Sequence, residues 1–360
     1  MFSATITKQE LLNDIATFDV VDFAKTRNHL KGRVSRLSPY ITRGVITLPE
    51  IRHVILTKFS ARDAGKFIQE LAWRDYWQQV WFAKGRAIFS DLRFPRTDWI
   101  HTDLVAAIVY GDTQITVIDE AIAALFKTGY MHNHARMWLA MLACNVGSAN
   151  WQNMSRWLYY HLIDGDLASN MLSWQWVAGT NSSKRYVANQ SVINSCSDYK
   201  ESDTYLTLPR EEVGEGPVPE LLKASVPFSY QMEYPQSEDY DESAETVFLY
   251  SPWTLNPDWR VGEAGERVLI IEPLWFDEFP VSPKVFKFIL GVARTQVPGI
   301  KVVVGNAVDL AVSPSTKIRH KAYPMHEGWP GEADPEPRLF PHVVGYHPSF
   351  FKFWAACQNG

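Results

Sequence analysis

Cysteine is scarce in this chain. Its 360 residues include three cysteines, Cys144, Cys196 and Cys357, which stand far apart and form no CxxC pair. Because iron–sulfur clusters, zinc fingers and disulfide frameworks need grouped cysteines, this spacing argues against all three and fits a reducing compartment, so we expect a cytoplasmic location. The polar and charged start, residues 1–14, lacks the pattern of a signal peptide.

Long apolar runs are also missing, because no stretch reaches the roughly 18 residues that a membrane span needs. There is no GxGxxG in the C-terminal part that would mark a dinucleotide site. The histidines of that part, His320, His326, His342 and His347, are scattered without a metal-ligand spacing. We therefore expect neither a membrane partner nor a metal site.

The net charge of −5 conceals an asymmetry between the two parts of the chain. Residues 1–200 hold 22 Lys and Arg against 17 Asp and Glu, whereas residues 201–360 hold 13 against 23. A basic front half suits contact with a polyanion such as nucleic acid, and ordinary surface charge explains so modest an excess equally well.

Aromatic residues are abundant, at 13% with 14 tryptophans, and most apolar residues follow a helical period. The fold class expected is mainly α with a small C-terminal α/β segment. Helices are predicted over 8–24, 62–83, 112–128, from about 131, over 152–163 and over 283–294, and strands over 267–272 and 301–304. The predicted division is 1–198 for the helical domain, 199–265 for an acidic, irregular linker rich in proline and glycine, and 266–360 for the α/β region.

The stretch 128–180 holds the most unusual residues. It begins TGYMHNHARM, continues through DGDLASN at 164–170 and ends with WQW at 174–176. One helix face there carries Asn133, Arg136 and Met137, a mixture that suits the wall of a polar, planar ligand. Arg136 can pair with Asp164 or Asp166, and a purely structural salt bridge remains the alternative.

Two upstream segments add to this pattern. The run 25–36 has five Lys and Arg residues and leads into a helix start at which Ser38 can cap and Pro39 can occupy the first turn. Such a start favours an anion, for instance a pyrophosphate, although a simple capped helix explains it too. On the helix over 62–83, Glu70 and Trp73 share a ridge that can hydrogen-bond and stack on a base, and an ordinary amphipathic helix is the alternative.

Together, VSRLS at 34–38, ELAWRD at 70–75, TGYMHN at 128–133, DGDLASN at 164–170 and WQW at 174–176 resemble the FAD-binding helical domain of DNA photolyases and cryptochromes. The resemblance covers roughly residues 20–180. The family's usual N-terminal α/β antenna domain does not precede it, so the chain resembles a short photolyase-like member. The resemblance implies an all-helical domain that holds FAD in a U shape.

The resemblance also implies roles for individual residues. Asn170 matches the residue that faces flavin N5, where an amide favours reduced flavin. The phosphate loop corresponds to Ser35, Arg36, Leu37 and Ser38, the cation at the diphosphate to Arg74, the isoalloxazine lining to Asn133, Arg136, Asp164 and Asp166, and the indole relay that refills the flavin to Trp174, Trp151 and Trp99.

The pocket for a cyclobutane pyrimidine dimer corresponds to Glu70, Trp73, Met137 and Trp176. Trp73 and Trp176 would stack on the lesion, Glu70 would hydrogen-bond its edge, and the dimer would leave the base stack. The resemblance implies a histidine-rich pattern at these positions in relatives that repair (6-4) lesions, whereas this chain has Asn133 and Met137. This difference favours cyclobutane dimers as the substrate. The chain departs from the family pattern at Phe23, Val34 and Tyr130.

The function expected from the resemblance is light-driven repair of cyclobutane dimers in DNA, single strands included, by electron transfer from excited reduced FAD. The expected form is a monomeric photolyase-type lyase that uses light absorbed by FAD itself. A cryptochrome-like photoreceptor that binds FAD without repair is the alternative, and a structural protein that has lost its flavin is a third hypothesis.

Overall fold

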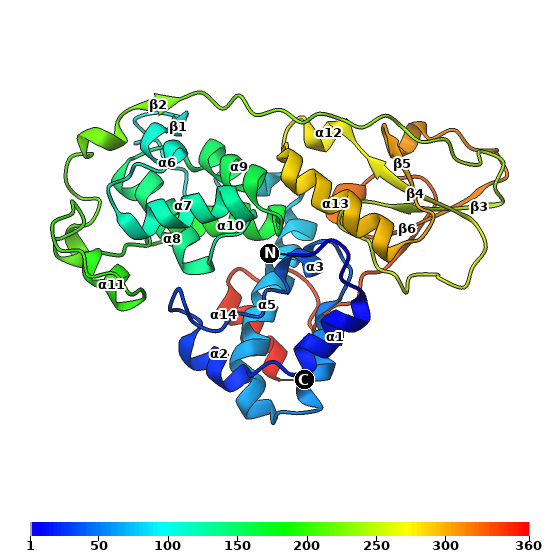
Figure 1. Ribbon diagram of the computed structural model, residues 1–360, viewed down its shortest axis with the longest axis horizontal. Coiled ribbons are helices and arrows are strands. Elements are labelled where there is room, and N and C mark those ends of the chain that lie inside the picture. Colours follow the sequence, from blue (N-terminus) through cyan, green and yellow to red (C-terminus); the bar gives the residue numbers. More distant parts are fainter. Residues whose placement is uncertain (1, 360) are drawn as a thin grey trace. The chain divides into compact units, whose positions relative to one another are not determined.

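The computed structural model describes residues 2–359, and they pack into two compact units (Figure 1). The sheet unit holds the described residues up to Val20, the segment Ser35–Ala83 and the residues from Gln231 onward. The helical unit holds Val21–Val34 and Lys84–Tyr230. Each unit has its own core and is described separately. Within residues 2–359, no helix is both long and apolar enough to cross a membrane.

The helical unit is built around α10, which packs against both α8 and α9. Tryptophans fill its core, with Trp138, Trp151 and Trp157 fully buried. Its helices are α2 (Val20–Thr26), α6 (Ala106–Tyr110), α7 (Thr116–Thr128), α8 (Asn133–Met141), α9 (Trp151–His161), α10 (Leu167–Ala178) and α11 (Gln190–Ser195), with a π turn at Leu142–Val146, 3-10 turns at Gly85–Phe89, Arg210–Glu212 and Glu220–Leu222, and the antiparallel pair β1 (Leu104–Val105) and β2 (Ser225–Val226).

Gly129 sets the turn between α7 and α8. Its φ of 74° ends α7 in the left-handed region, and a Cβ there would lie 2.6 Å from Cγ2 of Ile163. Only glycine meets both demands without strain. The next helix begins at Asn133, two residues later than the sequence predicts, because the side chain of His132 accepts a hydrogen bond from the His134 N–H and caps α8.

The sheet unit joins N-terminal helices to the C-terminal sheet. Its helices are α1 (Lys8–Ala16), α3 (Ser38–Thr42), α4 (Leu48–Leu56), α5 (Ala61–Lys84), α12 (Pro273–Phe276), α13 (Pro283–Gln296) and α14 (Phe350–Gln358), with 3-10 turns at Ala307–Asp309 and Pro324–His326. The single helix predicted over 8–24 is wrong: α1 ends at Ala16, where Thr17 donates from its hydroxyl to the Asp14 carbonyl and caps the helix, and α2 begins after it.

Five parallel strands form one sheet in the order β5-β4-β3-β6-β7. The central strands β3 and β4 are almost wholly buried on both faces, as parallel strands require. Their core includes Val247, Leu249, Val268 and Ile270. The strands are β3 (Thr246–Tyr250), β4 (Glu266–Ile271), β5 (Lys301–Val304), β6 (Lys317–Lys321) and β7 (Glu332–Asp334).

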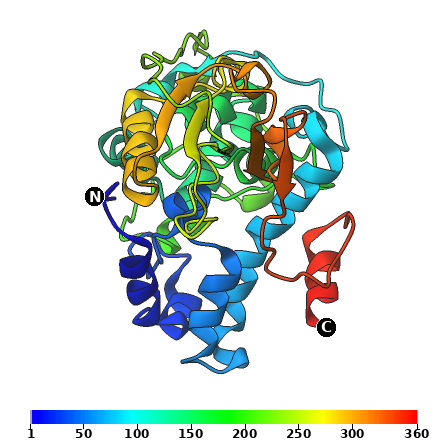
Figure 2. The same cartoon turned by 90° about the vertical axis from the view of Figure 1, so that its right-hand side faces the viewer.

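The central position of β3 corrects one prediction, because Thr246–Tyr250 lies in the stretch 199–265 that composition describes as irregular. The boundaries proposed at residues 198 and 265 stay predictions. The chain places β4 and β5 on one side of β3 and then crosses back to place β6 and β7 on the other side. This reversal makes a topological switch point between the carboxyl ends of β3 and β6. At the far end of the unit, α14 lies beside α5 (Figure 2).

Candidate functional site

Arg136 and Asp164 form a hydrogen-bonded ion pair in the helical unit. Arg136 Nη2 donates to both carboxylate oxygens of Asp164, at 3.0 and 2.8 Å, and its Nε donates to the Met131 carbonyl at 2.8 Å. The Asp164 side chain is 3% exposed and that of Arg136 is 22% exposed. The pair that the spacing allows is therefore made with Asp164. Asp166 instead caps α10, because its Oδ1 accepts from the Ser169 N–H at 2.7 Å.

Two amides lie near these charges along α8 and α10. Asn170 donates through Nδ2 to the Ser155 carbonyl at 2.9 Å, which fixes the orientation of its amide on the first turn of α10. Asn133 is the first residue of α8, and its Nδ2 lies 3.8 Å from the Met137 sulfur. The spacing of four therefore brings Asn133 and Met137 together on one helix face.

A neutral histidine precedes these residues. Burial lowers the pKa of His132 to about 4, and the nearby charges of His134 and Arg136 act in the same direction. Near neutral pH the ring is therefore uncharged, which leaves Arg136 as the cation of this helix start.

The tryptophans assigned to the indole relay differ in their surroundings. Trp174 and Trp151 are buried, and Trp151 Nε1 donates to Asp91 at 2.7 Å. Trp99 is half-buried, with the Arg96 guanidinium 4.0 Å from its ring centroid. Two buried tryptophans and one half-buried tryptophan permit electrons to pass between the core and the surface. The indole relay itself stays a prediction.

Trp176, on α10, is 36% exposed and contacts the Tyr186 ring at 5.5 Å. An indole that is partly open to solvent can accept a base on its face. In the sheet unit, Trp73 differs: its ring is stacked on Phe350 of α14, with centroids 3.6 Å apart and planes 9° apart. One face of Trp73 is therefore occupied by the chain itself.

Glu70, one turn before Trp73, pairs with Lys66 at 2.8 Å and is 36% exposed. The i,i+4 pair on an open helix face is weak, of the order of 0.3–0.5 kcal/mol, so Glu70 can exchange this partner for another.

The phosphate-loop segment VSRLS leads directly into α3 in the sheet unit. Arg36 has a positive φ of 56° and is exposed. The cap of α3 is Leu37 rather than Ser38, and no side chain caps the helix, so the prediction that Ser38 serves as N-cap is wrong. Ser38 is the first residue of α3, and Leu37 at the cap position already has helical backbone angles. Ser35 is half-buried in the same segment.

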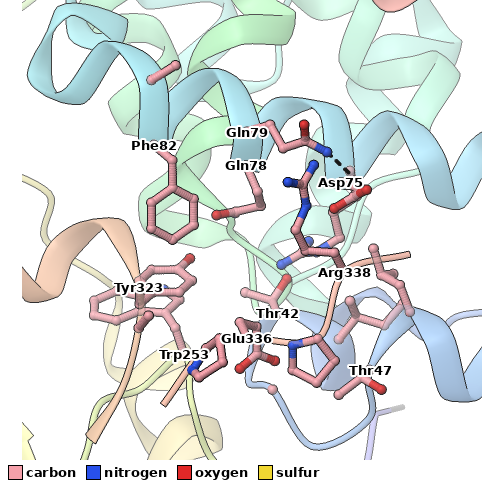
Figure 3. A pocket seen from close by; sticks show the side chains of 18 of the residues that line it. Thr42, Thr47, Asp75, Gln78, Gln79, Phe82, Trp253, Tyr323, Glu336 and Arg338 are labelled. Atoms are coloured by element: carbon pink, nitrogen blue, oxygen red, sulfur yellow. Dashed lines mark hydrogen bonds between the residues drawn. The ribbon is translucent and has the colours of Figure 1, made fainter. Parts of the chain in front are cut away.

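A cavity of about 480 Å³ opens beside α5 in the sheet unit (Figure 3). Arg74, assigned from the resemblance to the flavin diphosphate, lies on its wall. The cavity also contains residues that the sequence did not single out. They are Asp75, Gln79, Trp253, Tyr323 and Arg338.

Asp75 is the most perturbed acid of this cavity. Burial raises the pKa of Asp75 to about 6, although the charge of Arg338 and a hydrogen bond from Gln79 act in the opposite direction. The spacing of Asp75, Gln78, Gln79 and Phe82 on one face of α5 is a signal that could have been found in the sequence. The approach of Arg338, more than 250 positions later, could not have been found in that way.

The comparisons with known proteins cover most of α5 and the helical unit from Lys84 onward. Residues 67–242 match the family described as the FAD binding domain of DNA photolyase. The chain is 34% identical over 212 residues to the deoxyribodipyrimidine photo-lyase of Streptomyces griseus, which spans 57% of this chain and 43% of that protein. It is 30% identical over 179 residues to the enzyme of the same name from Alkalihalophilus pseudofirmus, across 48% and 37% of the two chains.

A further relative is a cryptochrome DASH from Idiomarina loihiensis, 27% identical over 173 residues, across 45% of this chain and 38% of that one. The chain thus spans less than half the length of each of these three relatives. The stretch 67–242 is thus similar to the FAD-binding domain of the photolyase and cryptochrome family.

The residues of the helical unit fit the cofactor of that family. A planar isoalloxazine needs fixed donors and acceptors at its polar edge, and the unit offers a guanidinium held by a buried carboxylate and an amide held by a carbonyl. The neutral state of His132 keeps further positive charge away from Arg136. This donor set fits FAD.

Proposed function

We propose that this protein repairs cyclobutane pyrimidine dimers in DNA, single strands included, in a light-driven reaction that uses FAD. The observation that carries the proposal is the Arg136–Asp164 pair, which lies inside the stretch that matches the photolyase FAD-binding domain. The relatives named deoxyribodipyrimidine photo-lyase support the reaction class.

FAD, when bound, would supply the light-driven one-electron chemistry that opens the cyclobutane ring. Arg136, fixed by Asp164, would hold the polar edge of the ring system, and Asn170 would present its oriented amide. Asp166, by capping α10, keeps Asn170 at the start of that helix. Trp174, Trp151 and Trp99 are assigned the delivery of electrons from solvent.

Substrate residues are proposed in each unit. In the helical unit, Trp176 stacks on a base, and Met137 and Asn133 line the path beside it. In the sheet unit, Glu70 hydrogen-bonds the pyrimidine edge, and Trp73 provides a second stacking surface once Phe350 has moved from it. Ser35 and its neighbours to Ser38, together with Arg74, are assigned to the diphosphate.

The test is a repair assay on purified protein with its flavin reduced. Ultraviolet-irradiated oligonucleotides, single-stranded and double-stranded, are incubated under blue light or in the dark, and the remaining dimers are counted by mass spectrometry after digestion. The proposal expects dimers to disappear only under light. Equal dimer counts under the two conditions would contradict it.

The second candidate function is a cryptochrome-like photoreceptor, favoured by the stacking of Phe350 over Trp73, which closes one proposed lesion surface. Glu70→Ala separates the two functions. Repair activity is expected to fall at least tenfold in this variant, while light-driven reduction of the flavin stays as in the wild type. A photoreceptor would reduce its flavin under light and leave dimers intact in both proteins. Lys66→Ala is the matched control, because it removes the partner of Glu70 on the same helix face.

A further inference from the structure

The Trp151 indole is fully buried, and its N–H ends on a carboxylate. Nε1 donates to Oδ1 of Asp91 at 2.7 Å, while Oδ2 of Asp91 accepts from the Arg96 backbone N–H at 3.0 Å. Both oxygens act as acceptors, which is the pattern of an ionised carboxylate. Asp91 itself is half-buried. The contact therefore joins a buried, oxidisable ring to a carboxylate that reaches solvent.

The loop that carries Asp91 is fixed to the two helices on which the inner tryptophans of the relay lie. Gln175 of α10 donates to the Ile88 carbonyl at 2.7 Å and accepts from the Leu92 N–H at 2.9 Å. Gln152 of α9 donates to a carbonyl of the same loop at 2.8 Å. Because both helices hold the loop, the carboxylate is in place before any charge develops on the indole, and it needs no reorganisation.

Trp99, the third tryptophan assigned to the relay, has the opposite surroundings. The Arg96 guanidinium lies 4.0 Å from its ring centroid, and Nη1 of Arg96 is held by the Cys144 carbonyl at 3.0 Å. In the part of the chain that the structure describes, Nε1 of Trp99 is enclosed without a hydrogen-bond partner. Asp98 pairs with Arg96, but its side chain is 62% exposed against 11% for Arg96, so water screens its charge more strongly.

These surroundings act with opposite sign on an indole that loses an electron. The oxidised ring is positively charged, and its N–H becomes a strong acid. A carboxylate at hydrogen-bond distance from Trp151 favours the charge and can take the proton, whereas a guanidinium over Trp99 opposes the charge. The attraction between Arg96 and Trp99 also needs the electron-rich neutral ring, so oxidation removes it. Trp151 is therefore the easier of the two rings to oxidise.

We propose that Asp91 is the proton acceptor of the relay and traps the positive charge at Trp151. One electron passes from Trp151 through Trp174 to FAD, which accepts it after absorbing light. The Nε1–H bond of Trp151 breaks, the proton passes to Oδ1 of Asp91, and a neutral indolyl radical remains. A dissolved thiolate later returns one electron by way of Trp99 and becomes a thiyl radical, and the proton on Asp91 goes back to Nε1. This inference rests on the FAD and the relay of the proposed function.

The first test follows light-driven reduction of the flavin in the full chain, loaded with oxidised FAD and supplied with a thiol but no DNA. Transient absorption distinguishes a protonated from a deprotonated indole radical, and the wild type is expected to form the deprotonated one. Asp91→Asn cannot take the proton, so the radical should stay protonated and the yield of reduced flavin should fall at least about tenfold. Asp91→Glu should restore deprotonation. A protonated radical in the wild type, or a wild-type yield in Asp91→Asn, would overturn the proposal.

Asp98→Asn is the matched control, because Asp98 lies in the same segment and its loss leaves Arg96 uncompensated beside Trp99. Its yield of reduced flavin is expected to stay within about twofold of the wild type, since an exposed charge is well screened. A fall in Asp98→Asn without a fall in Asp91→Asn would place the trapped charge at Trp99 and refute the assignment.

A second readout needs no flavin. Nuclear magnetic resonance of the full chain with isotope-labelled indole nitrogens reports each indole N–H, and Trp151→Phe identifies the signal of Trp151. This signal is expected downfield and should move upfield in Asp91→Asn, because a hydrogen bond to a neutral amide is weaker. A signal that does not move would contradict the proposal. The repair assay starts from reduced flavin and does not use the relay, so dimers that persist under light refute repair alone.

Discussion

At the scale of the residue, the account depends most on Arg136. Its guanidinium holds the buried Asp164 carboxylate with two short contacts, so removing it takes away the cation that this carboxylate contacts. Arg136→Leu is expected to lower the free energy of unfolding by about 3–5 kcal/mol and to abolish retention of FAD through purification. Arg136→Lys should lose less stability but still bind flavin poorly, because a single ammonium cannot reproduce the two contacts.

Urea unfolding and the absorbance near 450 nm measure these two effects. If the Arg136→Leu variant keeps both wild-type stability and a full complement of FAD, the Arg136–Asp164 pair neither stabilises the helical unit nor contacts the cofactor. Arg156→Leu is a suitable control, because Arg156 lies on α9 and contacts the Phe228 ring without a part in the proposed site.

Asp75 gives a residue-scale prediction about pH. Its side chain is buried, and its folded pKa of about 6 stands above the ordinary value of 3.8. The folded state therefore binds the proton more tightly, so the contribution is complete below about pH 4 and is lost as the pH rises through about 6. Relative to Asp75→Asn, the wild-type free energy of unfolding should fall by about 3 kcal/mol over this window.

Urea titrations at pH 4, 5, 6 and 7 on the two proteins test this. Parallel curves, with a constant difference between wild type and Asp75→Asn, would mean that Asp75 titrates in the same way when folded and unfolded. Asp63→Asn provides the control, because Asp63 is an exposed residue in the first turn of the same helix.

Some of these side-chain contacts could be predicted from the sequence, and others could not. Arg136 and Asp164 are 28 positions apart, and the sequence predicts a pair between them only because each lies close to the end of a predicted helix. The structure confirms Asp164 as the partner of Arg136. The N-cap of α3 escaped prediction because Leu37 takes helical angles that its side chain does not indicate. Arg338 escaped because its approach to α5 depends on the path of the chain after β7.

At the scale of the element, α14 is the feature with most consequence. Its Phe350 covers Trp73, whereas Phe351, next to it, is 71% exposed and meets Trp73 only edge-on at 6.4 Å. Phe350→Ala is expected to uncover the indole and raise affinity for a dimer-containing single strand about fivefold or more, since stacking on a base is worth about 1–3 kcal/mol. Phe351→Ala is the matched control and should bind as the wild type does.

Fluorescence anisotropy with a labelled, irradiated oligonucleotide measures that affinity, and circular dichroism verifies folding. Equal affinity in the wild type and both variants would show that Trp73 is not a surface for the lesion. In that outcome α14 is a structural helix of the sheet unit, and recognition of the lesion falls to Trp176 and its neighbours.

Elements were predicted well where periodicity is strong and poorly where strands are short. The helix over 62–83 and the strands at 267–272 and 301–304 match α5, β4 and β5 within one or two residues. β6 and β7 escaped because KIRHK and EAD are short and polar and owe their strand form to pairing with β3 and with each other. β3 escaped because an acidic, proline-rich stretch surrounds its five apolar residues.

At the scale of the whole molecule, the family match and the sheet occupy different parts of the chain. The match ends at residue 242, and β3 begins at Thr246. The sequence therefore indicated the class of protein through the segments that precede the sheet, and it indicated little about the strand order that creates the switch point. The predicted use of light absorbed by FAD itself stays a prediction, and an action spectrum with a strong band outside the flavin absorption would oppose it.

The central claim is that the whole chain uses light to split cyclobutane dimers. The most direct measurement is the number of thymine dimers left in an irradiated single-stranded oligonucleotide after blue illumination with the full chain in its reduced form, beside an identical dark sample. The account predicts intact thymines recovered in step with the light dose and an unchanged dark sample. A dimer count that no dose of light lowers, measured on protein shown to carry FAD, would contradict it.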